Sequence, residues 1–456
     1  MTPLDFKKIM PVFVIVLIDL LGLTIIIPLM PLYATSFGAD ALTIGLLGAS
    51  YPIMQFAGAS LLGRLSDRYG RKPILLISQL GTFIGFIILG LANALPLLFL
   101  ARIVDGLSGA NISTAQAVIS DNTTEKTRTQ GLGLLGAAFG LGFIVGPTIA
   151  FVSLAISNND YHVPAFVAAG FSALSIALTW FWLEESLPVE KRGRGGTRAA
   201  ISFGAMLQAV RHPQVGLLLV LMFAQQIAFG GFEQLLSLFT LNRLGMDARG
   251  NAAIFVFVGV IVVAVQGGFI GPWSRKFGDR KLVYLGLATL AIGLSLTALT
   301  PNQPPPGYSK AALIEELTAR NGIVLRTNPG LTGNVPIMLP DDNNNGWPGL
   351  IWILMAMIPA SIGGGILQPA INSLITKRVE PGEVGGTLGF SAAFLSGANA
   401  IAPLIGGAIF QALGSTAPFL TFGLIMVMLL VASMQMIKPG REEMTAMGLA
   451  RGDAAR

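Results

Sequence analysis

The segment Gly63-Arg-Leu-Ser-Asp67-Arg68-Tyr-Gly70 recurs in altered form as Gly271-Pro-Trp-Ser-Arg275-Lys-Phe-Gly278, 208 residues further along the chain. A second pair of similar segments, residues 133–147 and 389–403, repeats at an offset of 256 residues. The two offsets differ because the second half carries an insertion, residues 301–348, with runs of Pro, Asp and Asn. This duplication predicts two halves built on one plan.

The composition places both halves in a membrane. Of 456 residues, 53% are hydrophobic and only 11% are charged, whereas a soluble domain carries about a quarter charged residues. This excludes a soluble enzyme and a disordered chain, and it predicts a multi-pass membrane protein. The chain has no Cys and two His, which argues against disulfides and against Cys or His metal sites.

Twelve stretches are long and apolar enough to cross a bilayer. They lie at residues 11–34, 43–62, 74–92, 95–119, 132–155, 163–183, 215–241, 252–273, 282–299, 349–375, 385–413 and 417–437. We therefore expect an all-α membrane protein of twelve transmembrane helices in two pseudo-symmetric six-helix bundles, the plan of transporters with a cavity between two repeats. The expected units are a first bundle (1–183), a linker (184–213), a second bundle (214–437) and a tail (438–456).

The basic residues indicate the orientation of these spans. Of the 29 Lys and Arg, 23 fall on the side that carries both termini, five fall on the opposite side, and Arg102 lies within a span. Lys and Arg accumulate on the cytoplasmic side of membrane proteins, so both termini are expected in the cytoplasm. The same rule accounts for the net charge of +6 without a nucleic-acid partner.

Several motifs resemble those of one transporter family. The loop Gly63-Arg-Leu-Ser-Asp67-Arg68-Tyr-Gly70-Arg71-Lys72-Pro73 resembles the signature loop of the major facilitator superfamily. The stretch from Asp19 to Pro31, Asp-x-x-Gly-x-x-x-x-x-Pro-x-x-Pro, resembles the first-span motif of its drug/proton antiporters. The resemblance covers essentially the whole chain except the insertion, which we expect to be a solvated spacer.

Further motifs resemble the antiporter group of that family. Arg102 with Gly106 and Gly109 resembles its fourth-span motif, and Gly142 to Gly146-Pro147 resembles its fifth-span antiporter motif. The stretch Leu238-Phe-Thr-Leu-Asn-Arg-Leu-Gly245 resembles the tetracycline/proton antiporter branch. That branch carries further acids in spans 3 and 9, where this chain has Gly85 and the apolar run 285–294, a departure that weakens tetracycline as the substrate.

The signature loop is expected to act as a cytoplasmic latch. Gly63 and Gly70 permit a tight turn and a close approach of helices. Asp67 can face a helix N-terminus, where a negative charge is stabilised, and Arg68 and Arg71 can clamp it. By resemblance, the cluster closes the cytoplasmic side when the cavity faces out. In the second copy the charges are exchanged, so that half cannot make the same latch.

Four charged residues within the spans are candidates for coupling. An ionised group in mid-bilayer costs about 3 kcal/mol on insertion scales, so such residues are usually functional. Arg102 and Asp105 lie three residues apart on one helix face and can pair, as a structural or a functional element. Asp19 and Glu233 have no neighbour of opposite sign in the sequence, so proton coupling or cation binding is favoured for them.

Polar residues within the spans are expected to line a substrate cavity or to bond helices together. They are Gln55, Asn111, Gln225, Gln226, Gln368 and Asn399. The fifth-span motif, Gly142, Gly146 and Pro147, is expected to pack helices closely and to kink the span.

The chain lacks the motifs of enzymes and nucleotide-binding proteins. Gly131-Leu-Gly133-Leu-Leu-Gly136 matches a dinucleotide-binding pattern but lies in an apolar span with no preceding strand. No phosphate-binding Gly-x-x-x-x-Gly-Lys loop and no protease or esterase motif occurs. We therefore expect no catalytic residues, no cofactor, no metal and no nucleotide.

The expected function is a monomeric, multi-pass carrier of the bacterial inner membrane or plasma membrane. Protons drive export of small amphiphilic, drug-like or tetracycline-like compounds by alternating access. The alternative is a metabolite or sugar uptake carrier or uniporter, because the loop and the fold are shared.

Overall fold

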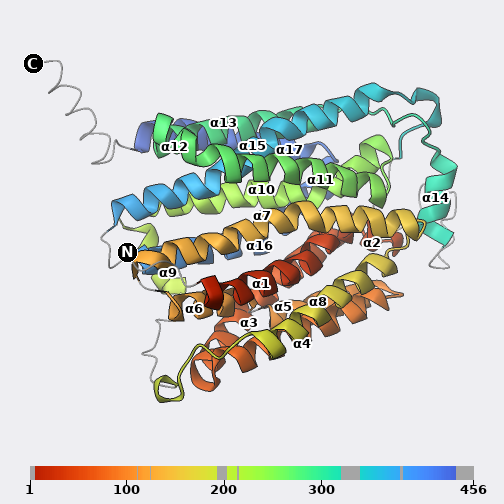
Figure 1. The fold of residues 1–456 in the computed structure, drawn as a ribbon. Helices are drawn as coiled ribbons and strands as arrows, with labels where there is room; N and C mark the ends of the chain where they lie inside the picture. The colour runs from red at the N-terminus through yellow and green to blue at the C-terminus, as the bar shows by residue number, and fades with distance from the viewer. Residues whose placement is uncertain are drawn as a thin grey trace, which may run out of the picture.

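The computed structural model describes residues 6–109, 111–123, 125–192, 203–212, 215–319, 339–379 and 384–437. Within these ranges the regular structure is helical, without β-strands. The long helices run roughly side by side along the molecule (Figure 1). Helix α1 begins and α17 ends at one end, here called the termini end, and helix α14 lies at the other, the α14 end (Figure 1).

Among the described residues, the first half contains eight helices and the second half nine helical segments. The first half consists of α1 (Phe6–Ile26), α2 (Met30–Ser36), α3 (Ala41–Tyr69), α4 (Arg71–Gly90), α5 (Leu95–Ser108), α6 (Asn111–Asp121), α7 (Glu125–Ile156) and α8 (His162–Trp182). The second half consists of α10 (Gly216–Leu244), α11 (Ala248–Val263), the π-helix η2 (Ala264–Phe269), α12 (Ile270–Phe277), α13 (Asp279–Ala298), α14 (Lys310–Ala319), α15 (Trp347–Arg378), α16 (Val384–Leu413) and α17 (Ala417–Met436). Three short segments, η1 (Val189–Lys191), α9 (Phe203–Val210) and η3 (Asp342–Asn344), lie in connections.

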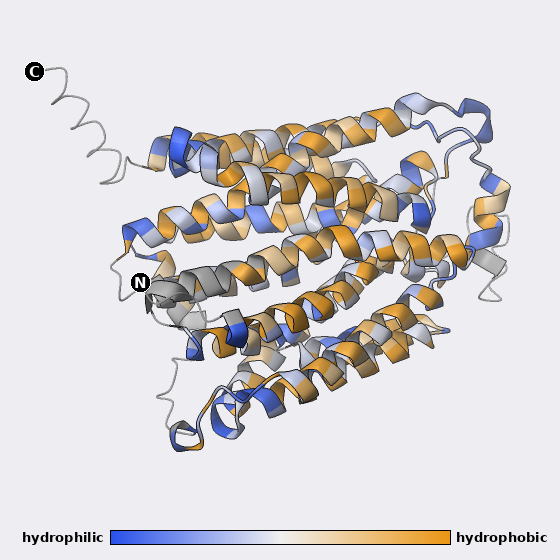
Figure 2. Cartoon of the chain, viewed as in Figure 1, coloured by the Kyte–Doolittle hydropathy of each residue, from blue (hydrophilic) through white to orange (hydrophobic). Residues whose placement is uncertain are grey.

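The predicted spans coincide with these helices. Eleven helical segments of the described residues are long and apolar enough to cross a membrane. The remaining predicted span, residues 43–62, lies in α3, whose 29 residues would extend about 44 Å at 1.5 Å per residue. Hydrophobic residues predominate along the helices, and hydrophilic residues gather toward the two ends (Figure 2). The protein is an all-α membrane protein with the expected twelve-span architecture.

Helix contacts separate the chain into two bundles. In the first half α1 packs on α7 and α8, and α4 packs on α5 and α8. In the second half α13 packs on α15 and α17, and α10 packs on α16. The halves are joined mainly by α3 with α16 and by α7 with α11, and α10 also contacts α2 and α3 of the first half. The bundles therefore meet mainly along two helix pairs, with α10 beside them.

Two predicted spans of the first half are interrupted, and their freed carbonyls find partners. The first span breaks at residues 27–29, where Pro28 cannot donate a backbone hydrogen bond and its carbonyl accepts one from Ser237 Oγ at 3.0 Å. The fourth span breaks between α5 and α6, where Gln55 Nε2 donates to the Gly109 carbonyl at 3.2 Å and Ser78 Oγ donates to the Ser108 carbonyl. Lipid cannot satisfy such groups, so interruptions survive only where protein or a cavity does.

The bundles are in close contact at the α14 end and apart at the termini end. A Cβ added to Gly45 would lie 2.4 Å from the Pro403 carbonyl oxygen, and one added to Gly407 would lie 2.5 Å from the Ala41 carbonyl oxygen. Nearer the termini end, a Cβ on Gly63 of α3 or on Gly389 of α16 would meet no described heavy atom within 4 Å. The structure thus shows a state that is closed at the α14 end.

We predict that adding a methyl group lowers stability at one glycine of α3 and not at another. Gly45→Ala forces a side chain against backbone, and overpacking of this kind costs about 1–3 kcal/mol, so the protein should unfold at a lower temperature. Gly63→Ala, on the same helix, has open space and should leave the unfolding temperature unchanged. Thermal unfolding of the purified proteins in detergent measures both, and equal effects would show that close packing at Gly45 is unimportant.

Candidate functional site

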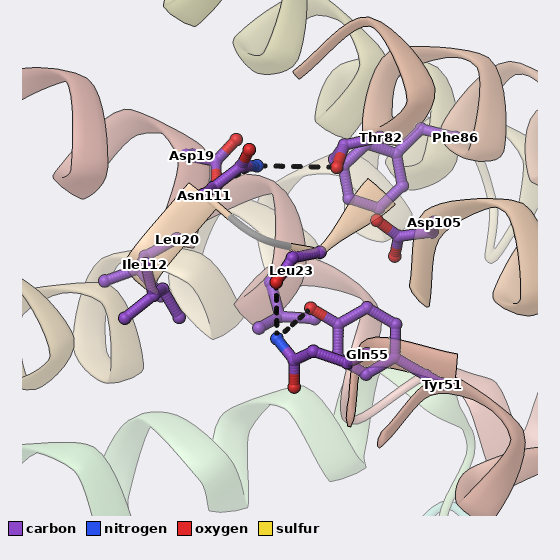
Figure 3. A pocket seen from close by; sticks show the side chains of 11 residues that line it. Asp19, Leu20, Leu23, Tyr51, Gln55, Thr82, Phe86, Asp105, Asn111 and Ile112 are labelled. Atoms are coloured by element: carbon purple, nitrogen blue, oxygen red, sulfur yellow. Dashed lines mark hydrogen bonds between the residues drawn. The ribbon is translucent and has the colours of Figure 1, made fainter. Parts of the chain in front are cut away.

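A small pocket of about 310 Å³ lies among the helices of the first bundle, at the interruption between α5 and α6. Four helices supply its polar lining: α1 gives Asp19, α3 gives Tyr51 and Gln55, α4 gives Thr82, and α5 gives Asp105 (Figure 3). Asn111, at the start of α6, completes it. Two predicted acids and two predicted cavity amides therefore share one site.

Asn111 donates a hydrogen bond to one of the two carboxyl oxygens of Asp19. Its Nδ2 donates to Asp19 Oδ2 at 2.8 Å and lies 3.5 Å from Thr82 Oγ1, as Figure 3 shows. The second oxygen of Asp19, Oδ1, is buried and accepts no hydrogen bond from any described residue. Asp19 is thus oriented through one oxygen and leaves the other for a proton or a ligand.

The expected pair between Arg102 and Asp105 is present. Arg102 Nη1 lies 3.3 Å from Asp105 Oδ2, and both side chains are nearly buried. The guanidinium also lies 4.3 Å from the centre of the Tyr51 ring, a distance at which a cation is attracted by an aromatic face. Gln55 Nε2 in turn donates to Tyr51 Oη at 3.1 Å. Tyr51 therefore links the charged pair to the interruption.

A second pocket of about 270 Å³ lies between the two halves. Arg102 lines it from the first half and Gln234 of α10 from the second. The adjacent residue, Glu233, is partly exposed and has no hydrogen bond or ion pair to any described residue. Arg102 is the residue common to the charged pair and to this interbundle space.

The remaining predicted cavity residues have different environments. Gln226 Nε2 donates to Asn399 Oδ1 at 2.8 Å and so bonds α10 to α16. Gln225 is buried and donates to Gln226 Oε1 at 3.3 Å, whereas Gln368 is exposed. In this state the three amides Gln225, Gln226 and Asn399 form a helix-to-helix contact, and Gln368 lies outside both pockets.

The fifth-span motif packs α7 against the helix that carries Asp19. A Cβ on Gly146 would lie 2.0 Å from Thr24 Oγ1, and Thr24 Oγ1 donates to the Gly142 carbonyl at 3.0 Å. Helix α7 continues through Pro147 without a break. Helix α7 also contacts α11 of the second half. A Cβ on Gly259 of α11 would lie 2.4 Å from the carbonyl oxygen of Phe143 in α7. Thus α7 connects the Asp19 helix to the opposite bundle.

The predicted latch residues cluster around Arg71 at the termini end. Arg71 is buried, and its guanidinium bonds Asp67 Oδ1 at 2.6 Å and Asp121 Oδ2 at 3.0 Å. Gly70 forms the turn with φ of +113°, a conformation that favours glycine. Arg68 does not clamp Asp67 as expected, because its guanidinium lies over the Tyr69 ring.

Two other expectations for the latch are corrected. The carboxylate at the N-terminus of α4 is Glu185, which accepts from the backbone N–H of Arg71 at 2.9 Å and of Lys72 at 3.2 Å, so Asp67 does not fill that role. Gly63 lies within α3, makes no turn, and has no close contact with any helix of the described residues in this state. All these partners belong to the first bundle and the segment that follows it.

The second half builds the same cluster with the charges exchanged. Gly278 repeats the glycine turn with φ of +79°. Asp279 follows it and accepts from Lys377 Nζ at 2.7 Å and from the hydroxyls of Ser274 and Ser373. Lys377 follows Asp121 by 256 residues, the offset between the repeated segments. The second half therefore has a similar cluster in which an acid, Asp279, takes the central place that Arg71 has in the first half.

Tyr51, Thr82, Asp121 and Glu185 are site residues that sequence reasoning missed. Tyr51 lies four residues before Gln55 on one helix face, a spacing that could have indicated it. Thr82, Asp121 and Glu185 act on residues at least 29 positions away in the chain, and the sequence carries no signal of those contacts.

Comparison with known proteins agrees with the geometry. The family model of the Major Facilitator Superfamily matches residues 12–324 and 331–446. The class B tetracycline resistance protein of Escherichia coli is 29% identical over 374 residues, 81% of this chain and 88% of that protein. The multidrug resistance protein 2 of Bacillus subtilis is 29% identical over 287 residues, 62% of this chain and 72% of that protein.

Solved structures share the fold at low identity. The human organic anion transporter MFSD10 (TETRAN) superposes with a TM-score of 0.65 at 21% identity, over 95% of this chain and 100% of that one. The nucleoside transporter NupG superposes with a TM-score of 0.69 at 12% identity, also over 95% and 100%. With a family model that matches nearly its whole length, the chain belongs to the Major Facilitator Superfamily of multi-pass cell-membrane transporters.

Proposed function

We propose that the protein is a proton-coupled antiporter that exports small amphiphilic compounds by alternating access. The observation that carries this proposal concerns Asp19, a carboxyl within a span. One of its oxygens accepts from Asn111, and the other is buried and has no hydrogen-bond partner among the described residues. A carboxyl in this setting can take up and release a proton as the pocket opens to either side. Glu233, which has no described partner either, is the candidate in the second half.

The proton gradient is sufficient for the proposed export. A charge that crosses about 100 mV gains about 2.3 kcal/mol, and half a pH unit adds about 0.7 kcal/mol. Together, about 3 kcal/mol supports a substrate gradient on the order of 150-fold. One proton per substrate would therefore be enough for useful efflux.

The charges near the pockets favour cationic or neutral substrates. Asp19, Asp105 and Glu233 supply three carboxyls against the single guanidinium of Arg102. This balance does not suit an organic anion, the substrate class named for the human structure. A Cβ on Gly85 would lie 2.8 Å from Asp105 Cβ, so an acidic side chain as in the tetracycline branch would not fit there. These points favour a drug-like amphiphile over tetracycline.

The proposed orientation places the termini end in the cytoplasm. The turns at Gly70 and Gly278 bring Arg64, Arg68, Lys72, Arg275, Lys276, Arg280 and Lys281 to that end. Positive residues favour the cytoplasmic side, so the α14 end would face outward. The structure then corresponds to an inward-facing state in which the latch is not engaged with the second bundle.

We predict that Asp19→Asn abolishes energised export while the protein still inserts into the membrane. An amide cannot carry the proton, although it keeps the shape and polarity of the side chain. Cells that express the variant should lose resistance to lipophilic cations in a susceptibility panel. In cells that express the wild type, a proton uncoupler should stop the efflux of the same compounds. Asp40→Asn is the matched control, because Asp40 caps α3 and Asn caps helices equally well. Full resistance with Asp19→Asn would contradict the proposal, and uncoupler-insensitive transport would favour a uniporter.

We further predict that Asp67→Asn slows transport but leaves membrane insertion intact. Loss of the charge weakens the bond to Arg71 and, on this proposal, the closure of the cytoplasmic side in the outward-facing state. Glu184→Gln is the control, since Glu184 is exposed near the same end. Membrane content by immunoblot and initial efflux rates measure the two effects. Wild-type rates with Asp67→Asn would remove the latch from the mechanism.

A further inference from the structure

Helix α14 is a packed element of the insertion and not the solvated spacer expected from its sequence. It packs against α2 of the first half, although the chain joins it to α13 and α15 of the second half. Two of its side chains are buried, Leu313 at 6% exposure and Leu317 at 4%. Helix α14 therefore reaches from one bundle to the other across the α14 end.

The residues that flank α14 are fixed to the second half. Gly245 ends α10 with φ of +61°, and the Tyr308 ring packs so closely on it that an added Cβ would lie 2.1 Å from the ring. Tyr308 Oη donates to the Pro340 carbonyl at 3.1 Å, and the backbone N–H of Lys310 donates to Asp342 Oδ1 at 2.7 Å. The second half thus carries α14 as an attached arm.

Asn159 joins this arm to the first half. It lies in the turn between α7 and α8, is buried, and has a left-handed backbone with φ of +62°. Its Nδ2 donates to Asp247 Oδ2 at 2.8 Å and to Glu316 Oε2 at 3.0 Å. An amide nitrogen has two hydrogens, so it can make both bonds at once. Asp247 also caps α11 by accepting from the Gly250 N–H at 2.7 Å.

We propose that Asn159 and α14 form a clasp that holds the α14 end closed and so controls how readily this transporter opens there. The donor belongs to one bundle, and both acceptors belong to the other. Separation of the bundles at this end must therefore break two hydrogen bonds to carboxylates, which are the stronger kind. The clasp requires only the two-bundle fold and does not depend on proton coupling.

Distances between spin labels in the full-length protein can test the clasp directly, because the chain contains no cysteine. Leu91→Cys with Leu299→Cys reports on the α14 end, one label on each bundle, at positions that are 63% and 61% exposed. Phe181→Cys with Met436→Cys reports in the same way on the termini end. Pulsed electron paramagnetic resonance in nanodiscs gives the distribution of each distance.

Glu316→Ala, which removes one hydrogen bond to a carboxylate, should raise the ratio of long to short distances at the α14 end by at least about tenfold. Asn159→Ala, which removes both bonds, should raise it further. The double variant should match Asn159→Ala, since that change already removes both bonds. Distances at the termini end should shorten in the same samples, which shows that the variants remain folded and alternate between states.

Two further variants test whether the distances depend on the hydrogen bond to Asn159 or only on the number of charges on α14. Glu316→Gln keeps an oxygen that can accept from Asn159 but lacks the charge, so it should shift the distances less than Glu316→Ala. Glu315→Ala removes the same charge from an exposed position on the same helix and should leave the distances unchanged. Unchanged distributions in both Asn159→Ala and Glu316→Ala would overturn the proposal, and so would an equal shift in Glu315→Ala.

Discussion

The interior of a bilayer contains no water, so each polar group within a span must find its partner in the protein. Helices of the first half are accordingly interrupted at places where the freed backbone carbonyls find a donor in the protein. The Pro28 carbonyl takes its hydrogen bond from Ser237 in the opposite bundle, and the Gly109 carbonyl takes one from Gln55 on a neighbouring helix. The interruption at Gly109 borders the Asp19 pocket, where irregular backbone and polar side chains satisfy one another.

The same constraint distinguishes the charged residues of the spans. Arg102 and Asp105 form an ion pair, and the guanidinium lies against the Tyr51 ring, so each charge is buried beside a charge of opposite sign. Asp19 is satisfied at one oxygen only. An incompletely satisfied acid in a span costs stability, and such a cost is usually retained for function. Asp19 is therefore the residue on which the proposed coupling depends.

Helix packing connects that acid to the movement of the bundles. The glycines of α7 let it lie against α1 close to Asp19, and another face of α7 meets α11 of the second half. At the ends of the bundles, charge clusters of opposite sign surround the glycine turns at Gly70 and Gly278. A change at the pocket can thus reach the interface between the halves through a short path of packed helices.

Much of this architecture could be predicted from the sequence, because hydropathy and duplication are properties of the chain itself. The spans and the intramembrane acids follow from hydropathy, and the glycine turn from duplication. The side chains that bind those residues could not be predicted from hydropathy or duplication. Asp67 was expected at a helix N-terminus that Glu185 occupies, and Asn111 could not be distinguished from other polar residues of the spans. Such contacts join distant segments, and they depend on the conformational state, which sequence patterns do not contain.

Reconstituted vesicles allow the most direct test of the central claim, that carboxyls within the spans exchange protons for substrate. The protein in which Asp19, Asp105 and Glu233 are all replaced by their amides is compared with the wild type, each given an imposed pH gradient and a fluorescent lipophilic cation. The account predicts uphill accumulation by the wild type and only downhill equilibration, or no movement, with the triple variant. Uphill accumulation by the triple variant would contradict it.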